Sequence, residues 1–172
     1  MRKMRYNVAA SLDGYIADAA GRFDWIPHDP AVDFAALFAH IDTVLMGRRT
    51  YDLVRSQSGP AWKKGTRVYV VSRTLAPGER ADMTVVRDDP AALAESLRHE
   101  EGSGEIWLFG GGELCATLLA AGQVDSVEVT VVPVLLGGGV PLVAGGIERT
   151  ALALVDTKVY PSGMVALHYS VK

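Results

Sequence analysis

Three short segments of the chain combine residue types that could bind an anionic cofactor. In the first, Gly47 is followed by Arg48, Arg49 and Thr50. Glycine permits a tight turn, and the next residues would stand at a helix N-terminus, where free N–H groups and the helix dipole favour an anion. The two guanidinium groups add planar donors that suit phosphate. The segment therefore predicts a phosphate site, or else two solvated arginines after an ordinary strand end.

The second segment consists of Ser72, Arg73 and Thr74, directly after an apolar stretch. In a dinucleotide site, an acidic residue near the adenosine ribose favours NAD, whereas arginine accommodates the 2′-phosphate of NADP. The first carboxylate after this segment is Glu79. NADPH is therefore the expected cofactor if a nicotinamide cofactor binds. Taken alone, the segment is explained better as an ordinary polar strand end.

The third segment places Gly110, Gly111 and Gly112 directly before Glu113 and Leu114. Three glycines leave no Cβ between the backbone N–H groups and a ligand pyrophosphate, and the following helix would point its N-terminus at it. The pattern is neither the G-x-G-x-x-G dinucleotide motif nor a P-loop. A glycine-rich turn from a strand to a helix, with no ligand, is the alternative.

A long loop over residues 11–30 follows the first predicted strand, and loops of this length often form lids or contact substrates. Asp13 could relay a proton, contact a substrate hydroxyl or only form a turn. Trp25 could be a lid aromatic, although a core position is favoured, and Asp33 is best explained as a helix cap. The four histidines share no metal-ligand spacing, and one cysteine, Cys115, excludes a cysteine cluster, so no metal is expected.

Alternating strands and helices must position these segments. Hydrophobic spacing predicts strands over residues 5–10, 43–46, 67–71, 83–86, 106–109 and 127–135, helices over 31–41, 48–54, 91–98 and 113–121, and a hairpin over 152–160 and 164–171. We expect one α/β domain over residues 1–172, a three-layer α/β/α fold with a mixed sheet of about eight strands and a C-terminal antiparallel hairpin. The candidate segments would then meet at the carboxyl edge of the sheet, where such folds bind ligands.

Composition limits the classes of function. The chain has 172 residues, 49% of them hydrophobic, and a net charge of −3. A mildly acidic chain is unlike a protein that binds nucleic acid or an anionic membrane. Its apolar runs are too short to span a bilayer and no apolar signal region precedes Asp13, so a cytoplasmic protein is expected. The apolar stretch 129–136 would pair two subunits edge to edge, which predicts a homodimer.

In their order, these segments resemble the dihydrofolate-reductase-like superfamily, and more closely the reductase domain of bacterial riboflavin biosynthesis (RibD C-terminal type) and its stand-alone relatives. The matching stretches cover nearly the whole chain: residues 11–17, 46–51, 71–75, 109–114, 133–142 and 160–163. The zinc deaminase motifs that often accompany this reductase, H-x-E and P-C-x-x-C, are absent. The resemblance therefore implies reductase activity without deaminase activity.

The cofactor that the resemblance implies is NADPH. Residues 47–50 and 110–112 would hold the pyrophosphate from two sides, and the Gly110–Gly111 peptide bond would be cis. Ser72, Arg73 and Arg49 would meet the 2′-phosphate. Hydride would pass to a C=N or C=O carbon of a small polar heterocycle such as a ribosylamino-pyrimidine, as in 5-amino-6-(5-phosphoribosylamino)uracil reductases.

The resemblance also implies where the substrate lies. Ser11 and Asp13 would stand beside it, in a loop that covers the nicotinamide, and Gly137 and Gly138 would border its pocket. Asp33 stands near the place of the acidic residue that faces the pterin in dihydrofolate reductases, out of clear register with it. Dihydrofolate reduction and a non-catalytic NADPH-binding protein are the alternatives.

Overall fold

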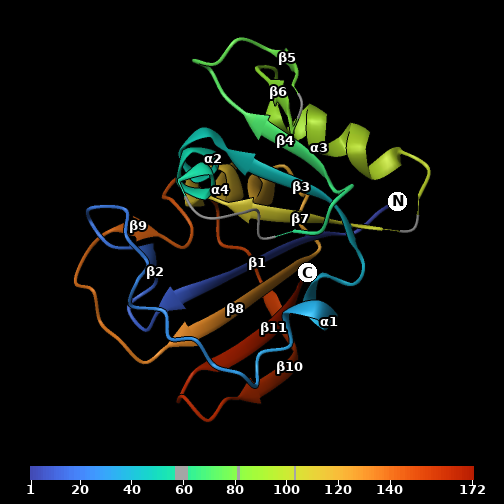
Figure 1. Ribbon diagram of the computed structural model, residues 1–172. Helices are drawn as coiled ribbons and strands as arrows, with labels where there is room; N and C mark the ends of the chain where they lie inside the picture. The colour runs from blue at the N-terminus through green and yellow to red at the C-terminus, as the bar shows by residue number, and fades with distance from the viewer. Residues whose placement is uncertain (57–61, 81, 103) are drawn as a thin grey trace.

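The computed structural model describes residues 1–56, 62–80, 82–102 and 104–172 and is built on a nine-stranded mixed sheet (Figure 1). The strands of this sheet stand in the order β10-β11-β8-β1-β7-β3-β4-β6-β5. Their bounds are β1 Met4–Ser11, β3 Ile41–Gly47, β4 Arg67–Val71, β5 Gly78–Glu79, β6 Thr84–Val86, β7 Glu105–Gly110, β8 Ser126–Val132, β10 Leu152–Val159 and β11 Val165–Val171. The helices are α1 Phe34–Phe38, α2 Arg48–Arg55, α3 Pro90–His99 and α4 Gly112–Ala120.

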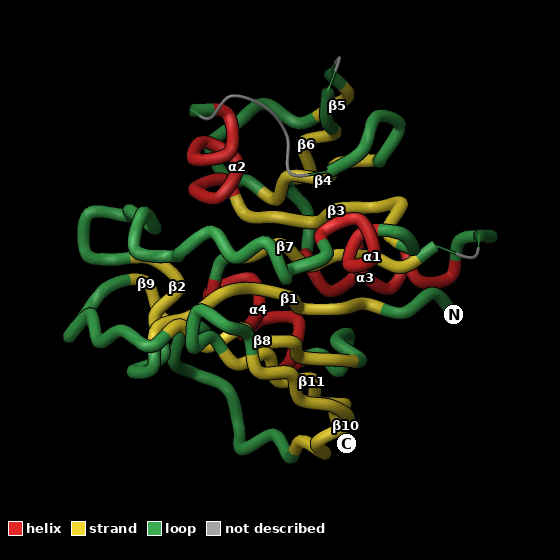
Figure 2. Tube along the Cα trace, turned by 60° about the horizontal axis from the view of Figure 1, so that its bottom comes forward, coloured by secondary structure: helices red, strands yellow, loops and turns green. Residues whose placement is uncertain are grey.

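The central strands are parallel and the flanking ones antiparallel. β8, β1, β7, β3, β4 and β6 run in one direction, whereas β11 pairs with β8, β10 with β11 and β5 with β6 in antiparallel register. A separate two-stranded sheet joins β2 (Tyr15–Ala17) to β9 (Val140–Pro141). Figure 2 places this pair to one side of the large sheet, which runs from β5 to β10.

Two apolar cores pack on the two faces of the sheet, so the expected three-layer fold is confirmed. On one face, Tyr6 and Leu108 pack with Leu118 of α4. On the other face, Val44 packs with Tyr51 of α2. Alternate residues of β3 face opposite cores, Leu45 the first and Val44 and Met46 the second, as the two-residue period of a strand requires. None of the described helices is long and apolar enough to cross a membrane.

Two details of the predicted fold are wrong. The helix expected over residues 31–41 is only α1, because Asp33 caps its N-terminus by accepting from the Ala36 amide, and Ile41 already pairs with Glu105 in the sheet. The stretch 129–136 is no free edge, because β8 is hydrogen-bonded to β1 on one side and to β11 on the other. The free edges of the described sheet are β10 and β5.

Candidate active site

The three predicted cofactor segments lie side by side at the carboxyl edge of the sheet. They follow β3, β4 and β7, and β3 pairs in parallel with both of the others. A Cβ placed on Gly47 would lie 3.8 Å from the carbonyl oxygen of Gly110 and 3.9 Å from the amide nitrogen of Gly111. A Cβ on Gly111 would lie 3.6 Å from Oγ1 of Thr50. The turn at Gly47 and the turn at Gly110 and Gly111, called the two glycine corners below, therefore lie next to each other at this edge.

Each glycine corner begins a helix. Gly47 is the N-cap residue of α2 and Gly111 that of α4, and neither helix start has a side-chain capping bond. The N–H groups of two first turns therefore point to the same edge without a side-chain acceptor, an arrangement that favours an anion. The Gly110–Gly111 peptide bond is cis, which confirms that expectation.

Gly112 has a different role from its two neighbours. A Cβ at this position would collide with the carbonyl oxygen of Pro141 and lie 3.2 Å from the amide nitrogen of Ala144. The Ala144 amide donates to the carbonyl oxygen of Gly112 at 3.1 Å. Glycine is required here because residues 141–144 approach the start of α4 closely.

Hydrogen bonds connect the ends of β3 and β4. Arg48 donates from Nε to Asp52 at 2.7 Å and from a terminal nitrogen to Oγ1 of Thr74 at 3.3 Å. Oγ of Ser72, a buried residue, accepts from the amides of Thr74 and Leu75 at 3.2 and 3.0 Å, which folds the turn after β4. The turn is therefore shaped by the serine hydroxyl that was expected to contact a phosphate.

Exposed arginines surround this edge. The side chain of Arg49 is 94% exposed and lies 3.8 Å from Glu113. Arg73 after β4 and Arg87 after β6 are exposed and line the same cleft. Because β4 and β6 are neighbours in the sheet, the two arginines supply positive charge at the outer end of the cleft. Arg87 was not among the predicted site residues.

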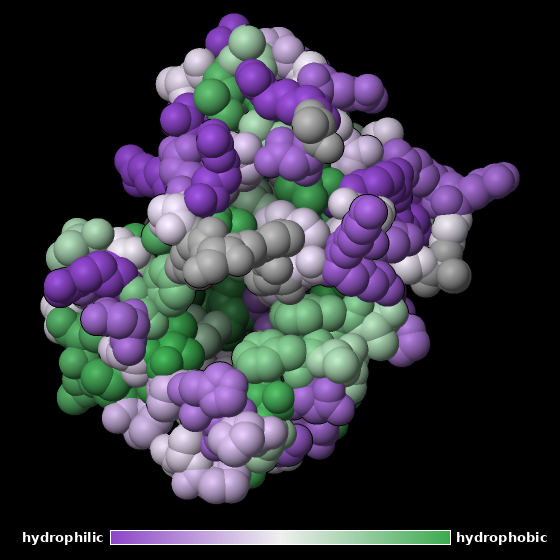
Figure 3. Space-filling view, in the orientation of Figure 1, coloured by the Kyte–Doolittle hydropathy of each residue, from purple (hydrophilic) through white to green (hydrophobic). Residues whose placement is uncertain are grey.

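A cleft of about 2240 Å³ runs from this edge across the sheet to the C-terminal hairpin. Figure 3 shows a hollow with hydrophobic residues at its bottom. The predicted cofactor residues that line it are Gly47, Arg48, Arg49, Thr50, Ser72, Arg73, Thr74, Gly111, Gly112, Glu113 and Leu114. Gly110 is buried behind this surface.

The predicted substrate residues lie elsewhere. The described lining of the cleft includes none of Ser11, Asp13, Trp25, Asp33, Gly137 and Gly138. Asp33 caps α1, as favoured from the sequence. Trp25 donates from its indole nitrogen to the carbonyl oxygen of Arg22 at 3.1 Å. Their assignment to the substrate therefore gains no support from the geometry.

Asp13 joins two distant loops. Its carboxylate accepts from Oγ of Ser11 at 2.6 Å and from the amide of Gly137 at 2.7 Å, and also from the amide of Leu136. The hydrogen bond from Ser11, reinforced by the two amides, lowers the pKa of Asp13 below its usual value. A carboxyl group with a lowered pKa is ionised at neutral pH and is a poor proton donor. This geometry gives Asp13 a structural role.

Other residues line the half of the cleft that lies away from the three predicted cofactor segments, over β7, β1, β8 and the C-terminal hairpin; because it is the part left for a substrate, an assignment to be tested, it is called the substrate half. Trp107 and Phe109 of β7 meet edge to face with ring centroids 4.4 Å apart, and Phe38 of α1 stacks on Trp107 at 4.6 Å. Polar side chains on the neighbouring strands also line this half of the cleft, among them Asn7 of β1 and Glu128 of β8. Sequence reasoning missed them, although polar residues alternate with valines over residues 127–131, inside a strand expected to be apolar.

The loop over residues 18–33 is anchored on the C-terminal hairpin. Asp29 is buried, and its carboxylate accepts from the amides of Ala31 and Ser162 at 2.8 and 3.0 Å. Hydrogen bonding by Ser162 is the main cause that lowers the pKa of Asp29. Lys158 adds a bond from Nζ to the carbonyl oxygen of Ala31 at 3.4 Å. The loop thereby lies along the substrate half of the cleft.

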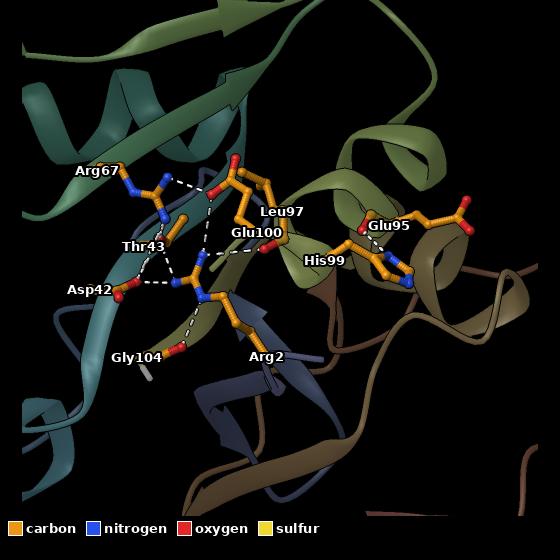
Figure 4. A network of polar contacts seen from close by, with 9 residues as sticks. All are labelled: Arg2, Asp42, Thr43, Arg67, Glu95, Leu97, His99, Glu100 and Gly104. Atoms are coloured by element: carbon orange, nitrogen blue, oxygen red, sulfur yellow. Dashed lines mark hydrogen bonds and ion pairs between the residues drawn. The ribbon is translucent and has the colours of Figure 1, made fainter. Parts of the chain in front are cut away.

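A further charged cluster lies at the opposite edge of the sheet and belongs to the scaffold. Figure 4 shows Arg2 at its centre. The side chain of Arg2 is 2% exposed, forms ion pairs with Asp42 and Glu100, and donates to the carbonyl oxygens of Gly104 at 2.9 Å and Leu97 at 3.3 Å. It ties the start of β1 to β3 and α3. The described residues include no group of three or more His, Cys, Asp or Glu placed to hold a metal ion.

The sequence matches the family described as the RibD C-terminal domain over residues 2–166. The chain belongs to this family. Its relatives include the proteins YyaP and YwjB of Bacillus subtilis, which are 32% and 31% identical, each over 98% of this chain and over 94% and 97% of their own lengths. The suspected relationship is therefore confirmed, and the family makes a reductase of the riboflavin-pathway type the general functional class.

Solved structures share the fold. The crystal structure of a protein from Shewanella sp. PV-4 has a TM-score of 0.84 and 29% identity, with 100% of this chain and 99% of that chain covered. A Thermotoga maritima diaminohydroxyphosphoribosylaminopyrimidine deaminase/5-amino-6-(5-phosphoribosylamino)uracil reductase has a TM-score of 0.75 and 16% identity, with 99% of this chain and 57% of that chain covered. At that identity, the second likeness establishes the fold alone.

Proposed function

We propose that the protein is an NADPH-dependent reductase that transfers hydride to a small polar nitrogen heterocycle. The observation that carries the proposal is the pair of glycine-led helix starts, α2 and α4, which meet at the carboxyl edge of the sheet without side-chain caps. Two such N-termini can share one pyrophosphate through their backbone N–H groups.

The residues present fit this cofactor. Gly47, Thr50 and Gly111 would hold the pyrophosphate, since the Thr50 hydroxyl is the only side-chain group that the described residues place within 4 Å of a Cβ on either glycine. Arg73 and Arg87 would attract the 2′-phosphate at the ends of β4 and β6. The nearby carboxylates of Asp52 and Glu113 are already paired, with Arg48 and Arg49. These two carboxylates therefore leave the positive charge of Arg73 and Arg87 available for the 2′-phosphate, which NADPH has and NADH lacks.

When bound, NADPH supplies the hydride, and the protein supplies orientation and shelter from water. Trp107, Phe109 and Phe38 form an apolar wall along the substrate half, which favours a planar ring and excludes water beside it. The carboxylate of Asp13 is held by two backbone amides, and Asp13 is not among the described residues that line the cleft. We infer that water protonates the heteroatom beside the reduced carbon.

We propose a ribosylamino-pyrimidine such as 5-amino-6-(5-phosphoribosylamino)uracil as the type of substrate. The family relationship and the fold shared with the Thermotoga reductase support this choice. No acidic side chain of α1 faces the cleft in the way that a pterin would need, because Asp33 caps that helix. Dihydrofolate is therefore the disfavoured alternative.

Replacing Arg73 with Ala tests the cofactor assignment. A charge-assisted contact to the 2′-phosphate contributes about 1.5–3 kcal/mol, so NADPH affinity should fall roughly tenfold to a hundredfold. NADH has no 2′-phosphate and should bind the variant as it binds the wild type. Calorimetric titration with both nucleotides measures this. Equal losses for the two would remove the 2′-phosphate assignment, and NADPH binding without turnover on pyrimidine or dihydrofolate substrates would favour a non-catalytic binder.

We also propose a homodimer, through β10 rather than β8. β10 is a free edge of the described sheet, and Leu154, Val155 and Val159 on it are 58, 57 and 72% exposed. An exposed apolar edge strand favours pairing with a second copy. Sedimentation equilibrium should give twice the chain mass for the wild type and a monomer for Val155→Lys. A monomeric wild type at micromolar concentration would contradict the dimer.

A further inference from the structure

A row of polar side chains crosses the floor of the substrate half. Asn7 on β1 is in register with Glu128 on β8, Glu128 with His168 on β11, and His168 with Asp156 on β10. Residues in register on neighbouring strands project from the same face of a sheet. All four line the cleft. The row therefore extends over four strands under the space that the substrate would enter.

Glu128 is the most tightly held member of this row. Its Oε2 accepts from Nδ2 of Asn7 at 2.6 Å. Its Oε1 lies 3.3 Å from Nε of Arg5 and 3.5 Å from Nε2 of His168. The side chain is 15% exposed. One hydrogen bond, from Asn7, and two ion-pair contacts, with Arg5 and His168, thus hold this largely buried carboxylate.

Packing alone does not explain a carboxylate at this position. β1 and β8 are interior strands, and their other face is apolar, with Tyr6, Val127 and Val129 in the core. A buried charged group is costly unless it is paired, and a hydrophobic residue would be the cheaper choice for stability. The adjacent row contains Ala9 and Ala166, whose small side chains leave space above the sheet. The polar row lies beside that space.

We propose that Glu128 recognises the N–H edge of a nitrogen heterocycle bound in the substrate half of the cleft. A carboxylate has about four acceptor positions, two on each oxygen; on Glu128, Asn7 occupies one on Oε2, and Arg5 and His168 lie beside Oε1 as ion-pair partners. A second position on Oε2 stays available for a ring N–H group. Asn7 and His168 act as positioning residues, and Trp107 and Phe109 flank the ring.

The inference rests on the proposed reductase function, whose substrate half it concerns. Binding of 5,6-diaminouracil and of 5,6-diamino-1,3-dimethyluracil is measured by calorimetry, with and without NADP⁺. The second compound lacks both ring N–H groups. We expect the wild type to prefer the first by at least tenfold. The Glu128→Gln variant should bind 5,6-diaminouracil at least tenfold more weakly and should lose most of the preference for it over the dimethyl compound. The reason is that a neutral amide accepts hydrogen bonds less strongly than a carboxylate.

Glu105→Gln is the matched control. Glu105 also forms an ion pair with Arg5, on the same face of the sheet, but it does not line the cleft. The Glu105→Gln variant should keep the wild-type affinity for 5,6-diaminouracil and the wild-type preference between the two rings. Both variants should bind NADPH as the wild type does. An unchanged preference in Glu128→Gln, an equal loss in Glu105→Gln, or a wild type indifferent to the two rings would overturn the inference. Failure of NADPH binding with the ring preference intact would instead contradict the proposed function.

Discussion

Replacing Gly47 with Ala separates a ligand site from a simple turn. Gly47 has φ −80° and ψ 163°, which alanine adopts without strain. The new Cβ would meet only Gly110 O and Gly111 N, at 3.8 and 3.9 Å, which are ordinary van der Waals distances. Alanine is a poorer N-cap than glycine by roughly half a kcal/mol, and the less flexible unfolded chain offsets about as much. The free energy of unfolding should therefore change by less than about 1 kcal/mol.

Binding of NADPH should change far more than stability. The methyl group would stand in the gap between the two helix N-termini and keep the pyrophosphate from at least one backbone N–H. A hydrogen bond to a charged group is worth about 1.5–3 kcal/mol, which corresponds to roughly tenfold to a hundredfold in affinity. Calorimetric titration and urea unfolding of the apo protein measure the two effects.

Gly138→Ala is the control, because a Cβ there has no neighbour within 4 Å and Gly138 does not line the cleft. We propose that the glycine corners bind the pyrophosphate. This reasoning would be refuted if Gly47→Ala kept the stability of the wild type and bound NADPH with an affinity within twofold of it.

Two further variants test the structural roles of charged residues. Asp13→Asn should be less stable than the wild type at pH 7, because the pKa of Asp13 is lowered in the folded state and its contribution to stability is lost as pH falls through that pKa. Urea unfolding should show the difference in stability between the two proteins shrinking below about pH 4. Turnover should persist in the variant, and a loss of turnover would restore Asp13 as the proton donor. Arg2→Met should lower the free energy of unfolding by about 2–3 kcal/mol, since Arg2 is buried and its partners Asp42 and Glu100 are half exposed and can be hydrated. This corresponds to roughly 4–12 °C in Tm; Lys3→Met, at an exposed neighbour, should change Tm little, and an equal shift in both would contradict the role of the buried ion pairs.

The edge that we propose for the cofactor could be located from the sequence because its signals are local. Each glycine corner follows an apolar strand directly, and parallel strands bring their carboxyl ends to one edge whatever their exact order. The strand β4 is likewise followed at once by Ser72 and Arg73. The placement of these segments therefore follows from strand–helix alternation alone.

The position of Asp13 outside the cleft lining could not be predicted, because its contacts join distant parts of the chain. The carboxylate of Asp13 is held by the amides of Leu136 and Gly137, which are 123 and 124 residues away. Nothing near Asp13 in the sequence indicates these partners. Glu128 differs, because a charged residue alternating with valines in an interior strand was a local signal that it faces a polar space.

The most direct test of the account is a crystal structure of the protein with NADPH. The account predicts the pyrophosphate between the N-termini of α2 and α4, beside Gly47 and Gly111, and the 2′-phosphate near Arg73 at the ends of β4 and β6. A nucleotide bound elsewhere on the protein, or crystals that stay free of nucleotide at millimolar NADPH, would contradict it.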